Sequence, residues 1–88
     1  MENLKLTENQ FAVGKAEFAT GIVLNNNGTR YRSGDDEIKM YEIFGDYNFA
    51  KEFAILKVSN NPEIECWIEN IKNEIVFIFD RNGERKVK

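Results

Sequence analysis

A single well-bounded helix pattern, set between runs of β-prone residues, constrains the fold of this chain more than any other feature. Residues 46–62 read D-Y-N-F-A-K-E-F-A-I-L-K-V-S-N-N-P. Asp46 is a good N-cap residue. The Asn-Asn-Pro end favours termination, because Asn tolerates the left-handed conformation and Pro cannot continue a helix. The pattern predicts a helix from about Tyr47 to Ser59.

Four apolar residues of this helix fall within one arc of a helical wheel, the pattern of a helix that packs on a sheet. They are Phe49, Ala50, Phe53 and Leu56. Lys51 and Glu52 are expected to point away from the sheet.

The residues before this helix favour antiparallel strands. Residues 22–32 hold an Asn-Gly pair between two β-prone runs, which predicts a hairpin with a two-residue turn at Asn27-Gly28. That turn pairs Leu24 with Tyr31 and Val23 with Arg32. After a polar turn at S-G-D-D-E, residues 38–44 are predicted to form a third strand.

Two further strands are predicted after the helix, at about 63–69 and 74–80, joined by a hairpin loop through 70–73. R-N-G-E at 81–84 turns the chain once more. The predicted register there pairs Asp80 with Arg85 and Ile78 with Val87.

The N-terminal segment allows two interpretations. T-E-N-Q at 7–10 has the pattern of a capping box and precedes an apolar run, so a helix near residues 8–19 is favoured, ending before Gly21. Its apolar face would hold Phe11, Ala12, Lys15, Phe18 and Ala19. The rival interpretation is an alternating strand over residues 16–24.

Together these elements predict an α+β fold: an antiparallel sheet of about five to six strands with one helix packed on one face. Eighty-eight residues suit a single domain, 1–88. The first ten residues lack the apolar core of a signal peptide, and no apolar run approaches the ~18 residues of a membrane span. A cytoplasmic setting is expected, with no membrane partner.

The strand at 63–69 raises the main functional question. Alternation places Ile64, Cys66 and Ile68 on the face toward the helix, together with Ile75, Phe77 and Phe79 of the next strand. The opposite face carries the candidate partner-binding residues: Trp67, Glu63, Glu65, Glu69, Val76 and Ile78. An apolar patch around a tryptophan, with a polar rim, is typical of protein interfaces. The sequence leaves open whether the chain itself covers this patch.

The sequence gives little support for catalysis or for metal binding. The chain has no His, which is the commonest general base and metal ligand. Its single cysteine, Cys66, is expected to lie on the core face, a poor setting for a nucleophile. D-D-E at 35–37 and D-R-N-G at 80–83 are more typical of a solvated loop and a plain turn than of cation sites. No enzyme activity, cofactor or metal is expected.

Basic residues suggest a different use. Arg30, Tyr31 and Arg32 place an aromatic ring between two cations, and Arg85 belongs to a basic C-terminus that ends at Lys88. Such residues contact phosphates in nucleic-acid-binding proteins, but they also protect the edges of ordinary hairpins. The net charge of −3 disfavours a general nucleic-acid binder.

Residues 41–68, Y-E-I-F-G-D-Y-N-F-A-K-E-F-A-I-L-K-V-S-N-N-P-E-I-E-C-W-I, resemble small standalone proteins of bacteria and phages, some of the toxin-immunity or inhibitor type. The resemblance covers about a third of the chain and implies no particular functional residues. It implies a protein that works by binding. The leading expectation is an acidic, non-enzymatic protein, monomeric or homodimeric, that inhibits or neutralises a protein partner through the Trp67 face. The acidic charge suits a basic partner. The alternative is a nucleic-acid-associated or regulatory protein that uses the basic hairpin and C-terminus.

Overall fold

The computed structural model describes residues 6–87, with the backbone alone for residues 37 and 38. Residues 1–5, part of the stretch considered above as a signal peptide, and Lys88 of the basic C-terminus lie outside the described residues. Within residues 6–87, no helix has the length and apolar character needed to cross a membrane.

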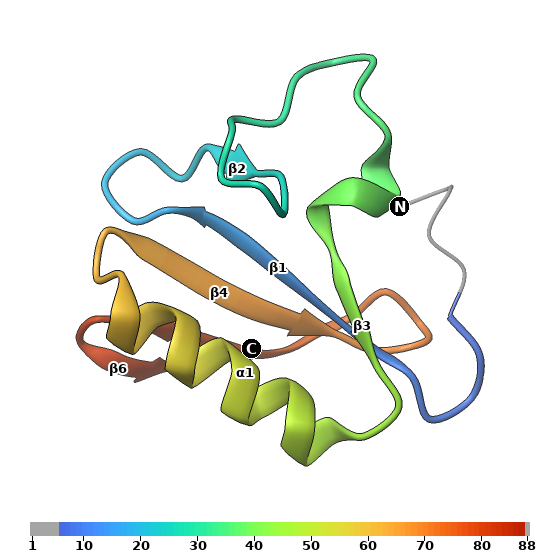
Figure 1. The fold of residues 1–88 in the computed structure, drawn as a ribbon. Coiled ribbons are helices and arrows are strands. Elements are labelled where there is room, and N and C mark those ends of the chain that lie inside the picture. The colour runs from blue at the N-terminus through green and yellow to red at the C-terminus, as the bar shows by residue number, and fades with distance from the viewer. Residues whose placement is uncertain (1–5, 88) are drawn as a thin grey trace.

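The fold is α+β, as predicted, and consists of an antiparallel six-stranded sheet with one helix packed against it (Figure 1). The strand order is β2-β1-β4-β5-β6, and β3 pairs with β1 on the same side as β2. The strands are β1 (Phe11–Glu17), β2 (Val23–Leu24), β3 (Glu42–Phe44), β4 (Ile64–Glu69), β5 (Ile75–Asp80) and β6 (Gly83–Arg85). A short 3₁₀ helix, η1 (Glu37–Met40), precedes β3, and the α-helix, α1 (Tyr47–Asn60), follows it.

The first segment is a strand, so the prediction of a helix over 8–19 is wrong. β1 lies inside the sheet between β4 and the β2–β3 edge, and all five of its inner residues are buried. A strand buried on both faces loses the alternation that identifies a strand in a sequence. The T-E-N-Q motif instead forms one isolated turn, in which Gln10 Oε1 accepts a hydrogen bond from the Thr7 N–H at 2.9 Å. The rival strand over 16–24 is interrupted by a turn, where the Gly21 N–H donates to the Glu17 carbonyl.

Helix α1 begins and ends close to the predicted residues. The Asp46 side chain accepts a hydrogen bond from the Phe49 N–H at 3.1 Å, and the Asn61 N–H closes the last turn on the Lys57 carbonyl. Asp46 therefore caps the helix as the sequence indicates. Asn61 ends the helix with φ of −147°, so the left-handed conformation considered for the Asn-Asn-Pro end is not used.

The buried face of α1 differs from the predicted one. Ala50, Ala54 and Val58 face the sheet, whereas the side chains of Phe49 and Leu56 are 65% and 59% exposed. Small residues suit this face, because the sheet supplies large side chains such as Phe77 to the same core. Phe53 is half-buried. Lys51 does not point away as expected, since its Nζ lies 5.4 Å from the ring centre of Phe77.

The hairpin after β2 is one residue out of the predicted register. Leu24 pairs with Arg30 rather than Tyr31, because residues 26–28 form a three-residue loop that ends at Gly28 with φ of 91°. A left-handed glycine at the end of a three-residue loop is a common hairpin connection. The predicted strand at 38–44 is also shorter than expected, since its first half is η1.

The β4–β5 pairing confirms most of the predicted faces. Trp67 pairs with Ile78 and Ile68 with Phe77, but a β-bulge at Ile68/Glu69 pairs Glu69 with Ile75. Ile75 therefore lies in the same cross-strand row as Glu69 and is exposed, instead of facing α1 as predicted.

The last hairpin is tighter than expected. Asp80 pairs with Gly83 and Ile78 with Arg85, because the turn uses only two residues, Arg81 and Asn82. The predicted pairs of Asp80 with Arg85 and of Ile78 with Val87 are wrong.

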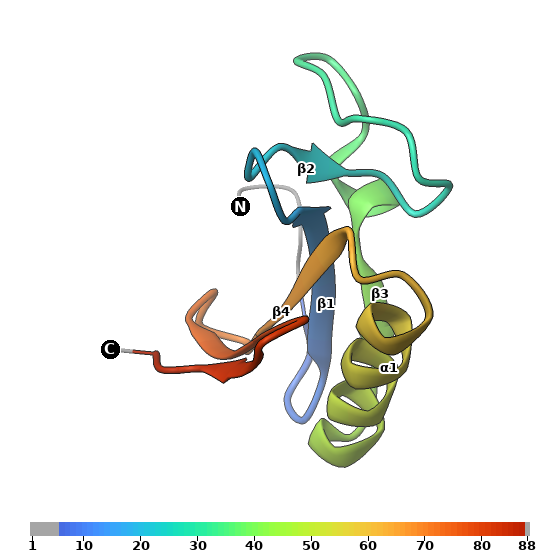
Figure 2. The ribbon, with the colours of Figure 1, turned by 90° about the vertical axis from the view of Figure 1, so that its left-hand side faces the viewer.

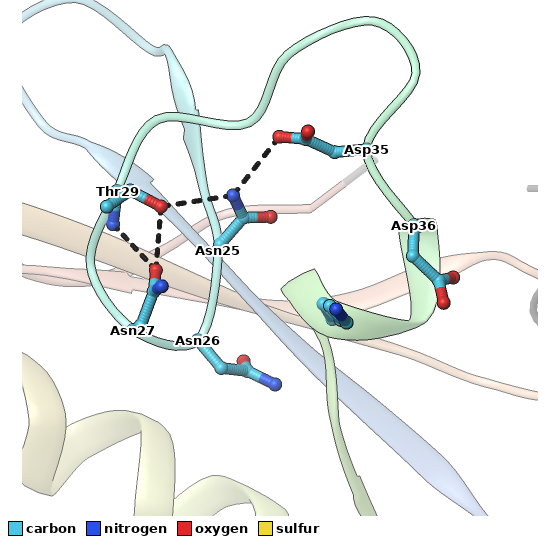
Figure 3. A pocket seen from close by; sticks show the side chains of 7 residues that line it. Asn25, Asn26, Asn27, Thr29, Asp35 and Asp36 are labelled. Atoms are coloured by element: carbon cyan, nitrogen blue, oxygen red, sulfur yellow. Dashed lines mark hydrogen bonds between the residues drawn. The ribbon is translucent and has the colours of Figure 1, made fainter.

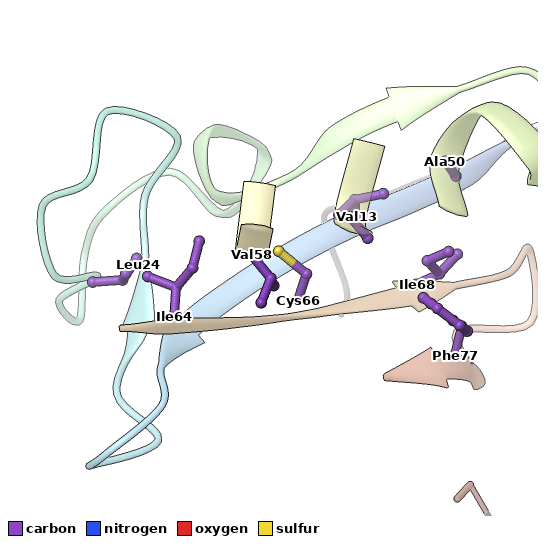
Figure 4. Packing of buried hydrophobic residues seen from close by; sticks show 9 residues of the cluster. Val13, Leu24, Ala50, Val58, Ile64, Cys66, Ile68 and Phe77 are labelled. Carbon is purple, nitrogen blue, oxygen red and sulfur yellow. The ribbon is translucent and has the colours of Figure 1, made fainter. Parts of the chain in front are cut away.

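Buried residues form two clusters, one on each face of the sheet. Figure 2 shows the sheet nearly edge on, with α1 along one side of it. The main core lies between α1 and the sheet (Figure 4) and contains Val13, Leu24, Ala50, Ala54, Val58, Ile64, Cys66, Ile68 and Phe77. The second cluster contains Ala12, Met40 and Tyr41, with Leu6, Val23, Tyr31 and Trp67 packed against it.

Candidate functional site

Trp67 lies on the face of the sheet opposite α1 and packs on its own chain. Its indole ring lies against the backbone of Gly14 on the neighbouring strand, so closely that a Cβ atom added to Gly14 would lie 2.4 Å from Cζ2 of the ring. The ring of Tyr41 meets it edge-on, with the ring centres 6.4 Å apart. Trp67 is therefore half-buried and is fixed in position by two neighbouring segments.

Glu69 is a structural acceptor rather than part of an exposed rim. Its Oε2 accepts one hydrogen bond from Trp67 Nε1 at 2.8 Å and another from the Tyr41 hydroxyl at 2.7 Å. The residue is 7% exposed. The carboxylate next to the tryptophan thus satisfies the polar ends of two aromatic side chains inside the second cluster.

The other two predicted carboxylates differ in their surroundings. The Arg85 guanidinium pairs with Glu65 and also with Asp80, at 3.1 Å for the latter. Glu63 is exposed, just before β4. Of the three acidic residues predicted around Trp67, Glu63 is the one that is exposed and forms no ion pair within residues 6–87.

Apolar side chains of β5 continue this face beyond the tryptophan. Ile78 lies beside Trp67 in a cross-strand pair and is half-buried, whereas Val76 and Ile75 are 37% and 42% exposed. We refer to Ile75, Val76 and Ile78 as the β5 strip. The structure therefore places Ile78 beside Trp67, with Val76 two residues earlier on the same strand. The sequence analysis missed Ile75, because nothing in the sequence indicates the bulge.

The basic residues of the alternative interpretation mostly serve the fold. Arg30 forms an ion pair with Glu17 at 2.9 Å, and this hydrogen bonding lowers the pKa of Glu17 and raises that of Arg30. Tyr31 packs against the second cluster and donates its hydroxyl to the Asp35 carbonyl. Arg32 is exposed. With Arg30 and Arg85 both engaged by carboxylates, less positive charge is available to phosphates.

A polar pocket of about 420 Å³ lies between the hairpin loop and the segment before η1 (Figure 3). The residues that line it are Asn25, Asn26, Asn27, Thr29, Asp35, Asp36 and Lys39. Its side chains bond mainly to one another: Asn25 Nδ2 donates to Thr29 Oγ1 and to Asp35 Oδ2. Hydrogen bonds from Asn25 and from the Arg32 N–H lower the pKa of Asp35, the latter contributing more.

This pocket has few polar groups left with which to bind a ligand. Among the described residues, Asn25 Oδ1 is buried without a hydrogen-bond partner, while most other groups in the wall already have one. Across the described side chains, no group of three or more His, Cys, Asp or Glu residues is placed to hold a metal ion. The D-D-E stretch contributes Asp35 and Asp36 to the wall, and the side chain of Glu37 is not described.

A lysine is buried at one end of the main core, next to the cysteine. Lys15 pairs with Cys66 across β1 and β4, is 4% exposed, and donates from Nζ to Asn26 Oδ1 at 2.8 Å. Burial lowers the pKa of Lys15 and raises the pKa of Cys66 to about 11. The Cys66 thiol stays protonated at neutral pH, so it lacks the thiolate form that acts as a nucleophile.

Comparison of the chain with models of protein families, with curated proteins and with solved structures finds no match. The function is therefore inferred from the surface of the molecule.

Proposed function

We propose that this chain is a small, non-enzymatic binding protein that inhibits or neutralises a protein partner through the sheet face opposite α1. The observation that supports this proposal most is the β5 strip, in which Ile78 pairs with Trp67 while Ile75 and Val76 are exposed on the same strand. Exposed apolar groups cost free energy in water, and they occur in groups mainly where another molecule covers them.

The site is well prepared for such contact. The hydrogen bonds of Trp67 and Tyr41 to Glu69 fix the indole ring, so little conformational entropy is lost when a partner packs against it. Tryptophan is among the residues most often found at interface hot spots. In this proposal Trp67 and the β5 strip make the apolar contact, while Glu69 only supports it.

Charge indicates the kind of partner. Exposed Glu63 and Glu74 lie at opposite ends of the paired strands β4 and β5, and the chain carries a net charge of −3. Acidic groups at the rim attract a basic surface and raise the association rate, more at low salt than at high salt. A basic protein partner therefore suits this face best.

Capture of partners by immobilised protein tests the proposal. Val76→Asp introduces a charge into the β5 strip, and Ile22→Asp makes the same change at the opposite edge of the sheet, where Ile22 is 36% exposed. We expect a protein that binds the wild type and the Ile22 variant with equal affinity and the Val76 variant at least about tenfold more weakly. Circular dichroism of both variants checks that the fold is kept.

Two results would contradict the proposal. A partner that binds the Val76 variant as tightly as the wild type uses another surface. A ligand that proves to be a nucleic acid, with affinity that falls steeply with salt and on Arg30→Ala/Arg32→Ala substitution, supports the alternative of a nucleic-acid-associated protein.

A further inference from the structure

Helix α1 carries a second apolar surface, in which Phe49 and Leu56 are exposed and Phe53 lies at the edge of the main core. Phe49, Phe53 and Leu56 follow one another at intervals of four and three residues, so they lie in one line along the helix. We refer to these three residues as the α1 stripe. Its two outer members, Phe49 and Leu56, are the most exposed of the large apolar side chains described, at 65% and 59%.

Contacts with neighbouring residues fix the position of the α1 stripe. Phe53, its middle member, packs on the ring of Phe44 in β3, with the ring centres 5.0 Å apart. The Nζ atom of Lys57 lies 5.5 Å from the ring centre of Phe53. Because the helix is capped at both ends and its other side is buried, the α1 stripe is a rigid surface.

The α1 stripe is complementary to itself. When two such helices run antiparallel, with a two-fold axis near Phe53, Phe49 of each copy lies opposite Leu56 of the other. The two Phe53 rings then lie near the axis. A surface that matches its own copy in this way is the requirement for an isologous dimer.

The charges along the helix match the same arrangement. Asp46 and Lys57 lie about three turns apart and therefore on the same side of the helix, one at each end of the α1 stripe. In the antiparallel pair, Asp46 of each copy lies within reach of Lys57 of the other copy. The two helix dipoles also oppose each other, which is favourable.

We propose that two copies of this chain associate through the α1 stripe in this antiparallel arrangement. Three apolar side chains per copy form an interface smaller than the roughly 1,200 Å² of total buried surface found in stable complexes. The dimer is therefore weak and reversible, with a dissociation constant between micromolar and about 1 mM. This surface lies on the opposite side of the sheet from the β5 strip, so the dimer leaves the proposed partner site open.

One residue weakens the arrangement and provides a specific test of it. Glu52 is exposed, halfway along the helix, and beside the axis it faces Glu52 of the second copy. Glu52→Gln removes this repulsion, and we expect the dissociation constant to fall about two- to tenfold. A merely structural role for Glu52 would not tighten self-association.

Sedimentation equilibrium over a range of protein concentrations up to about 1 mM tests the proposal. We expect the wild type to dimerise, Leu56→Asp and Phe49→Asp each to remain monomeric, and Ile22→Asp to dimerise as the wild type does. A wild type that stays monomeric throughout, or a Leu56→Asp variant that dimerises equally well, would overturn the proposal. Dimerisation that Glu52→Gln does not strengthen would overturn the antiparallel geometry. Each of these results is independent of the Val76→Asp test of the partner site.

Discussion

The indole ring of Trp67 lies against the backbone of Gly14, and no other residue type fits at that position. A Cβ atom placed on Gly14 would lie between 2.4 and 2.8 Å from three carbon atoms of the ring, well inside contact distance. A glycine inside a strand usually weakens it, unless something packs closely on the backbone. Here the ring of the neighbouring strand occupies that space, so the central strand and the second cluster depend on each other.

Gly14→Ala should therefore destabilise the fold by about 1–3 kcal/mol, the usual cost of forcing an extra methyl group into a packed site. Urea denaturation followed by Trp67 fluorescence measures the effect. Gly45→Ala is the matched control, because Gly45 has no atom within 4 Å of its Cβ position and no positive φ. The control should be neutral or slightly stabilising. Equal destabilisation by the two changes would mean that Trp67 does not pack on Gly14.

Glu69 should be replaceable by glutamine but not by leucine. Glu69→Gln keeps a carbonyl oxygen that accepts from Trp67 Nε1 and the Tyr41 hydroxyl, whereas Glu69→Leu leaves both donors without this partner. An unsatisfied buried polar group costs about 1–3 kcal/mol, so we expect the leucine variant to be less stable than the glutamine variant by about 2–4 kcal/mol. Denaturation midpoints of the two variants compare them directly. If leucine is tolerated as well as glutamine, the carboxylate does not hold the two rings.

The free energy of unfolding should depend strongly on side-chain size on the buried side of α1 and only weakly on its exposed side. Phe49→Ala removes a large exposed ring and should change the free energy of unfolding by less than about 1 kcal/mol. Ala54→Leu adds three carbon atoms to a fully buried position and should cost about 1–3 kcal/mol. Both are measured by chemical denaturation at low protein concentration, so that any self-association contributes little. A large loss from the first change and none from the second would show that the helix faces the sheet with its other side.

Stability should fall at alkaline pH because of Cys66. Burial raises its thiol pKa from 9.0 to about 11, so between these values the unfolded chain releases a proton that the folded chain keeps. The contribution of this group is constant below pH 9 and falls by up to about 2–3 kcal/mol as the pH rises to 11. Lys15 acts in the opposite direction, since its lowered pKa means that the unfolded chain binds more protons near pH 10. The comparison is therefore between the wild type and Cys66→Ala.

We expect Cys66→Ala to be less stable at pH 7, where it leaves a small cavity, but to lose less stability than the wild type between pH 9 and 10.5. Denaturation curves across this pH range provide the measurement. Parallel pH profiles for the two proteins would show that the thiol ionises equally in the folded and unfolded chains.

The sequence was most informative where local chemistry decides the structure. Asp46 and the Asn-Asn-Pro end mark the limits of α1 because capping depends on adjacent residues, and alternation along 63–69 places Trp67 beside Ile78. These features require no knowledge of the rest of the chain.

The features that the sequence did not indicate depend on tertiary contacts. β1 is buried on both faces, so its residues show no alternation, and the rotation of α1 depends on the large side chains that the sheet supplies to the core. The same is true of the candidate site. Tyr41 reaches Trp67 from a segment 26 residues earlier, and a bulge brings Ile75 to the surface. The spacing of apolar residues within a single segment cannot predict either of these two features.

The position of β1 in the sheet has a consequence for the way the chain folds during synthesis. β1 is made early, but its longest pairing is with β4, and β4 follows the whole of α1 along the chain. Until β4 is made, β1 has only the short strands β2 and β3 as neighbours, which together cover one of its edges. Pairings between distant segments slow folding, because a long loop must close first. The apolar central strand therefore has an open edge on the ribosome until most of the protein has been translated.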